Sequence, residues 1–196
     1  DTEKFALKII AEKPDIVAFS CYIWNITKTL ETARLIKQNC DCKIVLGGPE
    51  VAYRPKDVLE RYAFIDFVLS GEGEWTFPDF LDNLNGELSI VSGLTYRQNG
   101  KITTIPEKEY TETPPSPFSD EFFENLNGRI AYIETARGCP YRCAFCLSGR
   151  CSPLRFFDLE QVKKDILKLS ASGTQTVKFV DRTFNANEER ANEILL

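Results

Sequence analysis

The sequence predicts an α/β protein that begins with a doubly wound parallel sheet and ends with the first units of a second βα region. Apolar runs of strand length alternate with amphipathic segments of helix length through residues 1–84, and this alternation restarts at residue 129. A hairpin signal and a proline-rich stretch lie between the two regions. Because apolar strands separated by helices form parallel sheets covered on both faces, we expect domains at 1–84 and 129–196, joined by a hairpin and linker over 85–128.

The first region starts with an apolar stripe at helical spacing, which predicts a helix within residues 1–13. The runs IVAFSCYI (16–23) and KIVLGG (43–48) predict buried strands, and the amphipathic segment 27–39 predicts a helix between them. Since a right-handed crossover brings such strands side by side, we expect them to be adjacent and parallel. The region is completed by a helical stretch at 57–62, a strand at 65–74 and a helix at 75–84.

The remaining elements are predicted from local signals. Asn99-Gly100 between two alternating runs predicts a hairpin, and PPSPF (114–118) predicts a stiff extended linker. A strand at 129–136 is followed by a helix with Asp158 as its N-cap and Gly173 as its C-cap. The last elements are a strand at 175–181 and the start of another helix, so the second region reads as a βαβα start.

Composition narrows the class of protein. The 196 residues are 43% hydrophobic and 27% charged, as in globular domains, with no apolar run long enough to span a membrane and no signal peptide. A net charge of −5 argues against a nucleic-acid partner. We expect a cytoplasmic protein, and the odd number of cysteines, seven, disfavours a disulfide framework. The absence of methionine predicts that Asp1 is internal to a longer protein, and the absence of histidine leaves cysteine, carboxylates or a cofactor for catalysis.

The loop after the strand at 129–136 contains cysteines at a metal-binding spacing. Cys139, Cys143 and Cys146 form a C-x3-C-x2-C pattern, and Cys151 follows. Thiolates suit zinc or an iron–sulfur cluster, and a C-x2-C redox pair is a further alternative. Three thiolates without a nearby histidine favour a cluster whose fourth iron is open to another ligand. The loop leaves the carboxyl end of a parallel strand, where such sheets place their active sites.

The segment CPYRCAFC resembles the signature of the radical S-adenosylmethionine (radical SAM) enzymes. The resemblance implies that Cys139, Cys143 and Cys146 bind a 4Fe–4S cluster, that Phe145 lies beside the adenine of S-adenosylmethionine, and that Cys151 is a bystander. It also implies that residues 129–196 are the first βα units of a partial TIM barrel. The implied reaction is reductive cleavage of S-adenosylmethionine to a 5′-deoxyadenosyl radical.

The segment FVDRTFNANEER (179–190) resembles a D-D-x-F-x-x-N-x-x-R pattern of a radical SAM subgroup, with Arg182 in place of the second aspartate. The resemblance implies that Asp181 and Asn187 contact S-adenosylmethionine, and Asp181 could accept from its ammonium group. The alternative is that the segment is only a turn from a strand to a capped helix.

The runs VAFSCYIWN, VLGGPE and LSGEGE resemble the later strands of the cobalamin-binding domain that precedes many radical SAM barrels. The resemblance implies a cobalamin-like site at Ser20, Gly47, Gly48, Gly71, Glu72 and Gly73. Taken without the family, each glycine is a turn at the edge of a sheet. The first strand of such a domain would precede Asp1, and most of the barrel would follow residue 196. We therefore expect the isolated chain to hold neither cobalamin nor cluster and to be inactive.

These patterns favour a radical SAM enzyme acting on a small molecule, as a cobalamin-dependent methyltransferase or an anaerobic cyclase, with a flavodoxin or ferredoxin as electron donor. One alternative is a methylthiotransferase acting on RNA or protein, for which Cys21, Cys40 and Cys42 would have to bind a second cluster. Another is a non-catalytic binding module stabilised by zinc. The sequence assigns no catalytic residue and does not identify the substrate.

Overall fold

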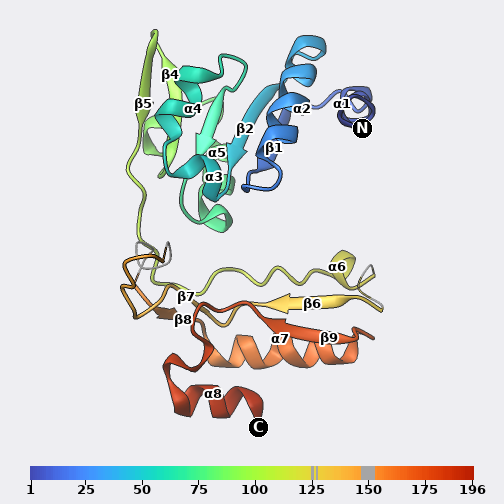
Figure 1. Ribbon diagram of the computed structural model, residues 1–196, viewed down its shortest axis with the longest axis vertical. Coiled ribbons are helices and arrows are strands. Elements are labelled where there is room, and N and C mark those ends of the chain that lie inside the picture. The colour runs from blue at the N-terminus through green and yellow to red at the C-terminus, as the bar shows by residue number, and fades with distance from the viewer. Residues whose placement is uncertain (125, 127, 147–152) are drawn as a thin grey trace. The chain divides into compact units, whose positions relative to one another are not determined.

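The computed structural model describes residues 1–124, 126, 128–146 and 153–196. The chain divides into two compact units, Asp1–Lys108 and Glu109–Leu196, which are called unit 1 and unit 2 below (Figure 1). Each unit has its own sheet and its own core. Cys151, the bystander of the cysteine loop, lies outside the described residues.

Unit 1 is built on a mixed five-stranded sheet. Its spatial order is the chain order, with strands β1 (Ile16–Ser20), β2 (Lys43–Gly47), β3 (Phe67–Leu69), β4 (Leu94–Gln98) and β5 (Lys101–Thr104). β1 and β2 are parallel, in register from Ile16 opposite Lys43 to Ser20 opposite Gly47, which confirms the predicted adjacent pair. β3 continues the parallel part, and β4 and β5 are antiparallel.

Helices cover both faces of this sheet (Figure 1). Alternate residues of β2 face opposite sides of the sheet. Ile44 and Leu46 pack in one buried cluster, and Val45 packs in the other. The first cluster includes Ala6 and Ala33 from the helices, and the second includes Phe80. The helices are α1 (Thr2–Ala11), α2 (Ile26–Asn39), α3 (Pro49–Ala52), α4 (Pro55–Arg61) and α5 (Gly73–Asn83), with a short 3-10 helix at Leu88–Ile90. The continuous apolar run of β2 is therefore explained by burial on both sides.

The hairpin β4–β5 is part of the sheet rather than part of a linker. The sequence placed it in a connecting segment that starts at residue 85, but β4 pairs antiparallel with β3 and unit 1 extends to Lys108. The turn is as predicted, because Asn99 and Gly100 have φ angles of 51° and 76°. The pairing follows from the pattern of β4, whose Leu94 and Tyr96 are buried in the same cluster as Phe80 of α5.

Unit 2 contains a parallel pair of strands joined by a helix. β6 (Ile130–Ile133) pairs with β9 (Thr176–Phe179), and α7 (Leu159–Ala171) lies between them in the chain. The core includes Ala131 and Ile133 of β6 and Leu169 of α7. The Asp158 carboxylate accepts a hydrogen bond from the Gln161 backbone N–H at 2.8 Å, as the predicted N-cap requires. The remaining helices are α6 (Asp120–Glu124), α8 (Glu188–Leu195) and a 3-10 helix at Phe184–Ala186.

A second small sheet in unit 2 closes the cysteine loop. The strand predicted at 129–136 divides into β6 and β7 (Ala136–Arg137), and β7 pairs antiparallel with β8 (Arg155–Phe156). The chain therefore leaves β7, forms the loop and returns to the same place at β8. Two small sheets do not by themselves define a barrel.

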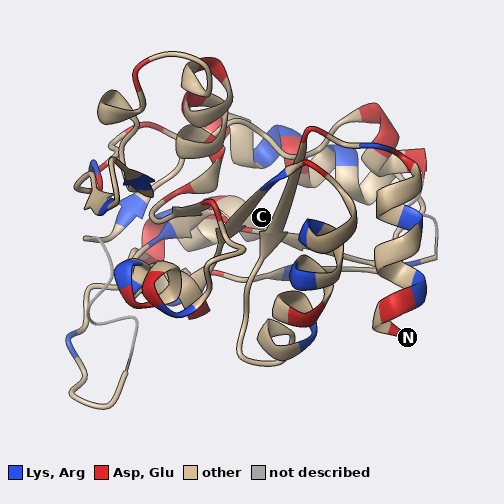
Figure 2. Ribbon diagram, turned by 90° about the horizontal axis from the view of Figure 1, so that it is seen from above, with Lys and Arg blue, Asp and Glu red and all other residues tan. Residues whose placement is uncertain are grey.

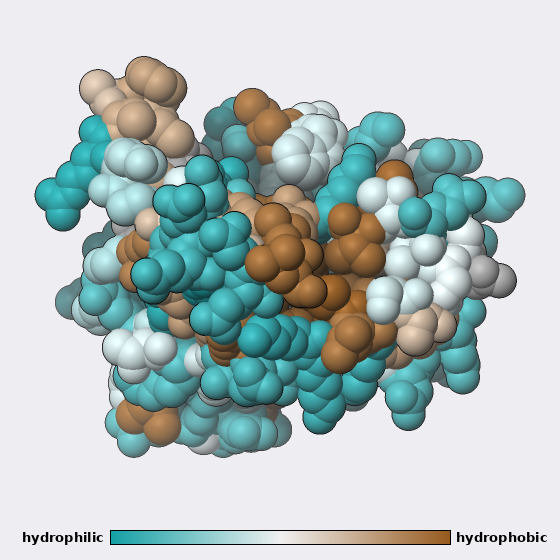
Figure 3. Space-filling view, turned by 90° about the horizontal axis from the view of Figure 1, so that it is seen from below, coloured by the Kyte–Doolittle hydropathy of each residue, from teal (hydrophilic) through white to brown (hydrophobic). Residues whose placement is uncertain are grey.

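The surface mixes charge signs and carries some apolar areas. Figure 2 shows that basic and acidic residues are interspersed along the helices. Figure 3 shows one face of the molecule, where apolar residues gather in a patch bordered by hydrophilic ones. Exposed apolar side chains of unit 2 include Tyr132, Leu167 and Leu195. Within the described ranges, no helix has the length and apolar character that a membrane crossing needs.

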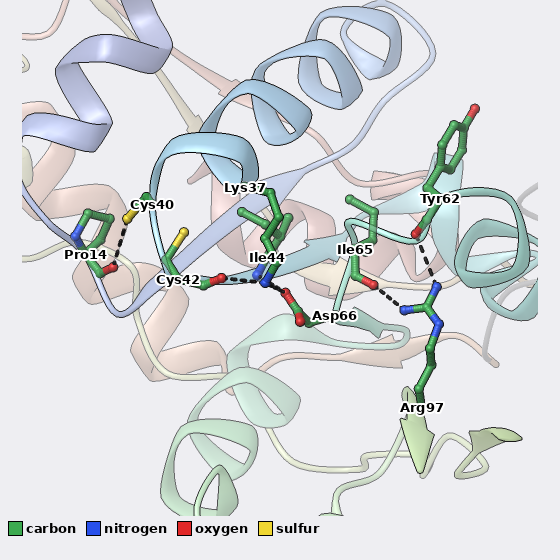
Figure 4. Close-up of polar contacts among 9 residues, drawn as sticks. All are labelled: Pro14, Lys37, Cys40, Cys42, Ile44, Tyr62, Ile65, Asp66 and Arg97. Atoms are coloured by element: carbon green, nitrogen blue, oxygen red, sulfur yellow. Dashed lines mark hydrogen bonds and ion pairs between the residues drawn. The ribbon is translucent and has the colours of Figure 1, made fainter. Parts of the chain in front are cut away.

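A polar network fixes the amino-terminal edge of the unit 1 sheet (Figure 4). The Lys37 ammonium donates to Asp66 Oδ2 and to the Cys42 carbonyl oxygen, each at 2.7 Å. The same Asp66 oxygen accepts from the Ile44 backbone N–H at 2.8 Å. The Arg97 guanidinium donates to carbonyl oxygens of the segment that joins α4 to β3. The network ties α2 and β4 to the starts of β2 and β3.

Candidate functional site

The sequence-predicted cobalamin-like residues of unit 1 lie at one edge of its sheet. Ser20 and Gly47 are the last residues of the paired strands β1 and β2, and they lie opposite each other in the register. Gly71 follows the end of β3, and Gly73 begins α5. Because parallel strands end at a common edge, residues far apart in the sequence are brought together there. Open α/β sheets bind ligands at this carboxyl edge.

Gly48 allows the loops after β1 and β2 to touch. Its φ is +94°, and a Cβ atom there would lie 2.7 Å from the Cys21 carbonyl oxygen and 2.8 Å from the Cys21 nitrogen. The loops are also joined by hydrogen bonds from Cys21 N–H to the Gly47 oxygen at 2.7 Å and from Glu50 N–H to the Cys21 oxygen at 3.2 Å. Glycine is therefore required for packing at this position.

The turn at Gly71 is the second constrained point of this edge. Gly71 has a φ of +85°, and a Cβ atom there would lie 3.4 Å from Glu107 Oε2, from the segment after β5. Burial raises the pKa of the Glu107 carboxyl above its ordinary value. The backbone oxygen of Glu72 accepts from the first turn of α5, and Gly73 has open space where a Cβ atom would be. Of the four predicted glycines, Gly48 and Gly71 have positive φ angles, whereas Gly47 and Gly73 leave room for a Cβ atom.

A groove of about 710 Å³ lies between α1, β1 and α2. Ser20 lines it from the end of β1, and Asn25 and Lys28 line it from the α2 side. Asn25 was not singled out from the sequence, yet its amide donates to the Ser20 carbonyl oxygen at 2.9 Å and accepts from the Tyr22 N–H at 2.8 Å. The signal for it was the position directly before α2, where asparagine is a common N-cap.

The three cysteines of the N-terminal region do not form a site. Cys21 follows the carboxyl end of β1, whereas Cys40 and Cys42 lie after α2 and before the amino end of the parallel neighbour β2. Burial raises the pKa of the Cys21 and Cys42 thiols to about 11. These thiols are placed at opposite ends of adjacent parallel strands, so they cannot share one cluster.

The cysteine loop of unit 2 has a fixed beginning and accessible thiols. Gly138, at a φ of +92°, turns the chain out of β7 into Cys139. Cys139 and Cys146 are half-buried, and Cys143 is exposed. The Cys139 Sγ lies 3.4 Å from the Thr183 Oγ1, and the Cys146 N–H donates to the Cys143 carbonyl oxygen at 3.0 Å.

The side chains of this loop are chemically suited to bind a metal ion or an iron–sulfur cluster. Its three cysteines are close in sequence, and none of them forms a disulfide bond. Across the described ranges, however, no three cysteine or carboxylate side chains are gathered closely enough to hold one metal ion. Phe145 is 94% exposed. The loop thus brings the predicted residues into one region without assembling them into a closed site.

Asp181 and Asn187, predicted to contact S-adenosylmethionine, make local bonds in the structure. Asp181 Oδ1 accepts from the Thr135 N–H at 2.6 Å, and Oδ2 accepts from the Thr135 hydroxyl. Asn187 Oδ1 accepts from the Arg190 N–H at 2.9 Å and caps α8. For Asn187 this is the alternative role of a helix cap, and the contact with S-adenosylmethionine stays a prediction for both residues.

Arg190, which the sequence matched only as a motif position, connects the two small sheets of unit 2. Its Nη2 donates to the Phe157 carbonyl oxygen at 2.7 Å and to the Thr135 carbonyl oxygen at 3.3 Å. Burial lowers the pKa of the Arg190 guanidinium, and the neighbouring Asp181 acts in the opposite direction. Asp181, Thr135 and Arg190 therefore hold both ends of the cysteine loop, a role that residue spacing alone did not reveal.

Comparison with known proteins gives the family of unit 1. Residues 1–81 match the B12 binding domain family. The chain is 33% identical to 2-(S-pantetheinyl)-carbapenam-3-carboxylate methyltransferase of Streptantibioticus cattleyicolor, over 78% of this chain and 25% of that protein. It is 28% identical to the cobalamin-dependent radical SAM methyltransferase TokK of Streptomyces tokunonensis, over 88% of this chain and 28% of the relative.

Two solved structures share the fold. The cobalamin-dependent S-adenosylmethionine radical enzyme OxsB matches with a TM-score of 0.75 at 23% identity, over 99% of this chain and 30% of its own. The radical S-adenosylmethionine methyltransferase TsrM of Kitasatospora setae matches with a TM-score of 0.77 at 19% identity, over the whole of this chain and 42% of its own. The chain therefore spans less than half of the length of each of these proteins. Residues 1–81 form a B12-binding domain, homologous to the N-terminal part of cobalamin-dependent radical SAM enzymes.

Proposed function

We propose that the protein acts in cobalamin-dependent radical SAM methyl transfer to a small molecule, with unit 1 binding cobalamin and unit 2 contributing the cluster-binding loop. One observation carries the proposal: a single chain joins a B12-binding domain to a C-x3-C-x2-C loop that follows a strand of a parallel pair. Unit 1 alone would bind a cofactor, and the loop alone would bind a metal. Their combination favours an enzyme over a binding module.

The carboxyl edge of unit 1 is suited to cobalamin. Gly47 and Gly48 let the ends of β1 and β2 and their loops pack together without intervening side chains, and we expect the ligand to lie along this edge. The Ser20 hydroxyl lies opposite Gly47 and can accept or donate a hydrogen bond to an amide of the ligand. Cobalamin, when bound, supplies a transferable methyl group. Ser20 and the backbone of Gly47 and Gly48 would contact and orient it.

The exposed apolar residues of β6 favour the interpretation that unit 2 is the start of a barrel. Ala131 and Ile133 of β6 face the core with α7, whereas Ile130 and Tyr132 point to the other side and are 43% and 55% exposed. A strand with apolar residues on both faces is typical of a parallel sheet that is covered on both sides. We interpret the second face of the β6–β9 pair as the one that further strands and substrate would cover.

The cysteine loop would hold the cluster through Cys139, Cys143 and Cys146. The cluster, when bound, supplies the electron for reductive cleavage of S-adenosylmethionine, and a flavodoxin or ferredoxin would deliver that electron. The residues of the chain have separate tasks there. The three thiolates bind, Thr183 orients Cys139 through the 3.4 Å contact, and Asp181 holds Thr135 at the base of the loop. Phe145, which is exposed, would lie beside the adenine.

The test is anaerobic reconstitution of the full-length parent protein with iron and sulfide, in the presence of hydroxocobalamin. The protein should retain cobalamin after gel filtration and contain iron and acid-labile sulfide. Single changes Cys139→Ala, Cys143→Ala and Cys146→Ala should each abolish the cluster, because each removes a thiolate ligand. The matched control Cys151→Ala should keep it.

Three outcomes would contradict the proposal, and each has a different meaning. Zinc without sulfide in the purified protein would show a zinc-stabilised module. Loss of the cluster in Cys151→Ala would show a four-thiolate site and contradict an open iron. Failure of the unaltered parent protein to retain either group would reject the proposal, whereas the isolated chain is expected to retain neither. 

A further inference from the structure

Cys40 and Cys42 form a pair of thiols at the amino end of the unit 1 sheet, apart from Cys21. Cys40 is the C-cap of α2 and has an extended backbone, with a φ of −142° and a ψ of 133°. Side chains two residues apart in an extended segment point to the same side. The Cys40 side chain accordingly lies in hydrogen-bonding contact with the Cys42 thiol, and neither cysteine is disulfide-bonded (Figure 4). The pair is therefore a dithiol to which the proposed function gives no role.

The segment that carries the two thiols is anchored at both ends. The Cys40 N–H donates to the Ile36 carbonyl oxygen at 2.8 Å. The Lys43 N–H donates to the Asp15 carbonyl oxygen, also at 2.8 Å. The Cys40 Sγ lies 3.8 Å from the Pro14 carbonyl oxygen. Because the backbone is fixed on either side of the pair, the two sulfur atoms are held together by the fold itself.

The pair is reached from solvent through Cys40. Cys40 is half-buried, whereas the Cys42 side chain is 2% exposed. Burial, and then the neighbouring Cys40 thiol, raise the pKa of Cys42 to about 11, and the Lys37 ammonium acts in the opposite direction. Cys42 therefore keeps its proton near neutral pH unless a thiophilic cation displaces it.

The number of donors restricts the kind of ion. In the part of the chain that the structure describes, no group of three cysteine, histidine or carboxylate side chains is close enough to share a metal ion. Structural zinc takes four ligands, and Ca²⁺ and Mg²⁺ take oxygen ligands. Thiolates are soft ligands that select Cu(I), and Cu(I) is stable with only two thiolates, one on each side of it. Two adjacent thiols without a third donor thus match Cu(I) better than zinc or an iron–sulfur cluster.

We propose that Cys40 and Cys42 form a two-thiolate site for a soft monovalent cation of the Cu(I) class. On binding, two S–H bonds break, two S–Cu bonds form and two protons pass to solvent, with no change of oxidation state. The site lies at the amino end of the parallel strands, whereas the cobalamin-like residues lie at their carboxyl end. The inference therefore goes beyond the proposed function and depends neither on cobalamin nor on the cysteine loop.

The test measures how fast iodoacetamide alkylates Cys40 in the full-length parent protein, with and without Cu(I), under anaerobic conditions. Trypsin cleaves after Lys37 and Lys43, so mass spectrometry of peptide 38–43 reports on this pair apart from every other cysteine. Cu(I) buffered with bicinchoninate should slow the alkylation of Cys40 by about tenfold or more once the site is about nine-tenths occupied, because only the free thiol group reacts. Zn²⁺ at the same free concentration should leave the rate unchanged.

Two variants identify the second thiolate. Cys42→Ala should remove the protection of Cys40 by Cu(I), because a single thiolate binds the ion weakly. Cys42→Ser keeps the size of the side chain with a hard oxygen atom and should behave in the same way, which guards against an effect of packing. The matched control is Cys21→Ala, which removes a buried thiol at the opposite end of the strands and should leave the protection unchanged. The alkylation rate of each variant without copper is its own baseline.

Four results would overturn the inference. The first is an alkylation rate of Cys40 in the unaltered protein that Cu(I) does not change. The second is equal protection in both Cys42 variants, since Cys40 would then bind the ion with another donor. Protection by Zn²⁺ would show that more than two ligands are recruited and would contradict a two-thiolate site. Recovery of peptide 38–43 with an internal disulfide, and no effect of Cu(I), would show a redox pair instead.

Discussion

Both hydrogen-bond donors of Thr135 are directed at the carboxylate of Asp181. The backbone N–H of Thr135 donates to Oδ1 at 2.6 Å, and its hydroxyl donates to Oδ2. Thr135 follows β6 and Asp181 follows β9, so the pair joins the carboxyl ends of the two parallel strands. An aspartate that was predicted from a motif to bind a ligand thus has a structural role in the described chain.

Asp181→Ala should destabilise unit 2 by about 1–3 kcal/mol, because it leaves the N–H and the hydroxyl of the buried Thr135 without their acceptor. Asp181→Asn should cost less, since the amide can accept from the Thr135 N–H and donate to its hydroxyl. Urea unfolding measures both. In a double-mutant cycle, Thr135→Val and Asp181→Ala should be coupled by at least about 0.5 kcal/mol. Additive effects would contradict the pairing.

Gly48→Ala should destabilise unit 1 by about 1–3 kcal/mol, because a non-glycine residue at positive φ is strained and its Cβ atom would lie 2.7 Å from a backbone oxygen. The control is Gly73→Ala. A Cβ atom there would have no atom within 4 Å, and alanine favours the helix that begins at this residue. The midpoint of urea unfolding should fall for the first variant and stay or rise for the second. Equal midpoints would show that the two loops can separate at no cost.

Asp66→Ala should destabilise unit 1 by about 1.5–3 kcal/mol, because the carboxylate accepts from an ammonium and from a backbone N–H. The pair Arg54–Asp57 provides the comparison, since it is 3.7 Å long and both side chains are largely exposed. Asp57→Ala should change the free energy of unfolding by less than about 0.5 kcal/mol. The measurement is again chemical unfolding, and a result in which Asp57 matters as much as Asp66 would be contrary to expectation.

The stability of unit 1 should fall between about pH 9 and pH 11. The pKa values of the Cys21 and Cys42 thiols are raised from 9.0 to about 11, mainly by burial, so the folded state keeps protons that the unfolded state releases. The stabilisation is complete below pH 9, the ordinary thiol pKa, and is lost as the pH rises through the folded-state value of about 11. Unfolding midpoints at pH 8 and pH 10.5 test this. A double variant, Cys21→Ala with Cys42→Ala, should lose less stability over the same pH interval. An equal loss would show that deprotonation of lysine or tyrosine, and not of these thiols, causes the effect.

The strands and helices could be predicted largely because their signals are local. The apolar runs of β1 and β2, the Asp158 N-cap and the Asn99-Gly100 turn depend on residues close in sequence, and each is found where its pattern placed it. The hairpin was assigned to a linker because pairing with β3 depends on contacts of Leu94 and Tyr96 with Phe80, which no local pattern contains.

The candidate site was predictable in part for the same reason. Parallel strands carry Ser20, Gly47 and Gly71 to one edge, so strand prediction was sufficient to place them together. The roles of Thr135 and Arg190 depend on side-chain geometry between elements, which sequence spacing does not specify.

The pairing of β7 with β8 makes the cysteine loop a separable insertion. Its two ends meet at the pairs Ala136–Phe156 and Arg137–Arg155, so the framework of β6, α7 and β9 does not depend on the length of the segment between them. Doubling such a segment raises its closure free energy by only about 0.6 kcal/mol. A longer loop, or one with different residues, should therefore change the stability of the fold only slightly. Relatives could diverge in this loop, and so in what surrounds their bound groups, while the scaffold beneath it remains constant.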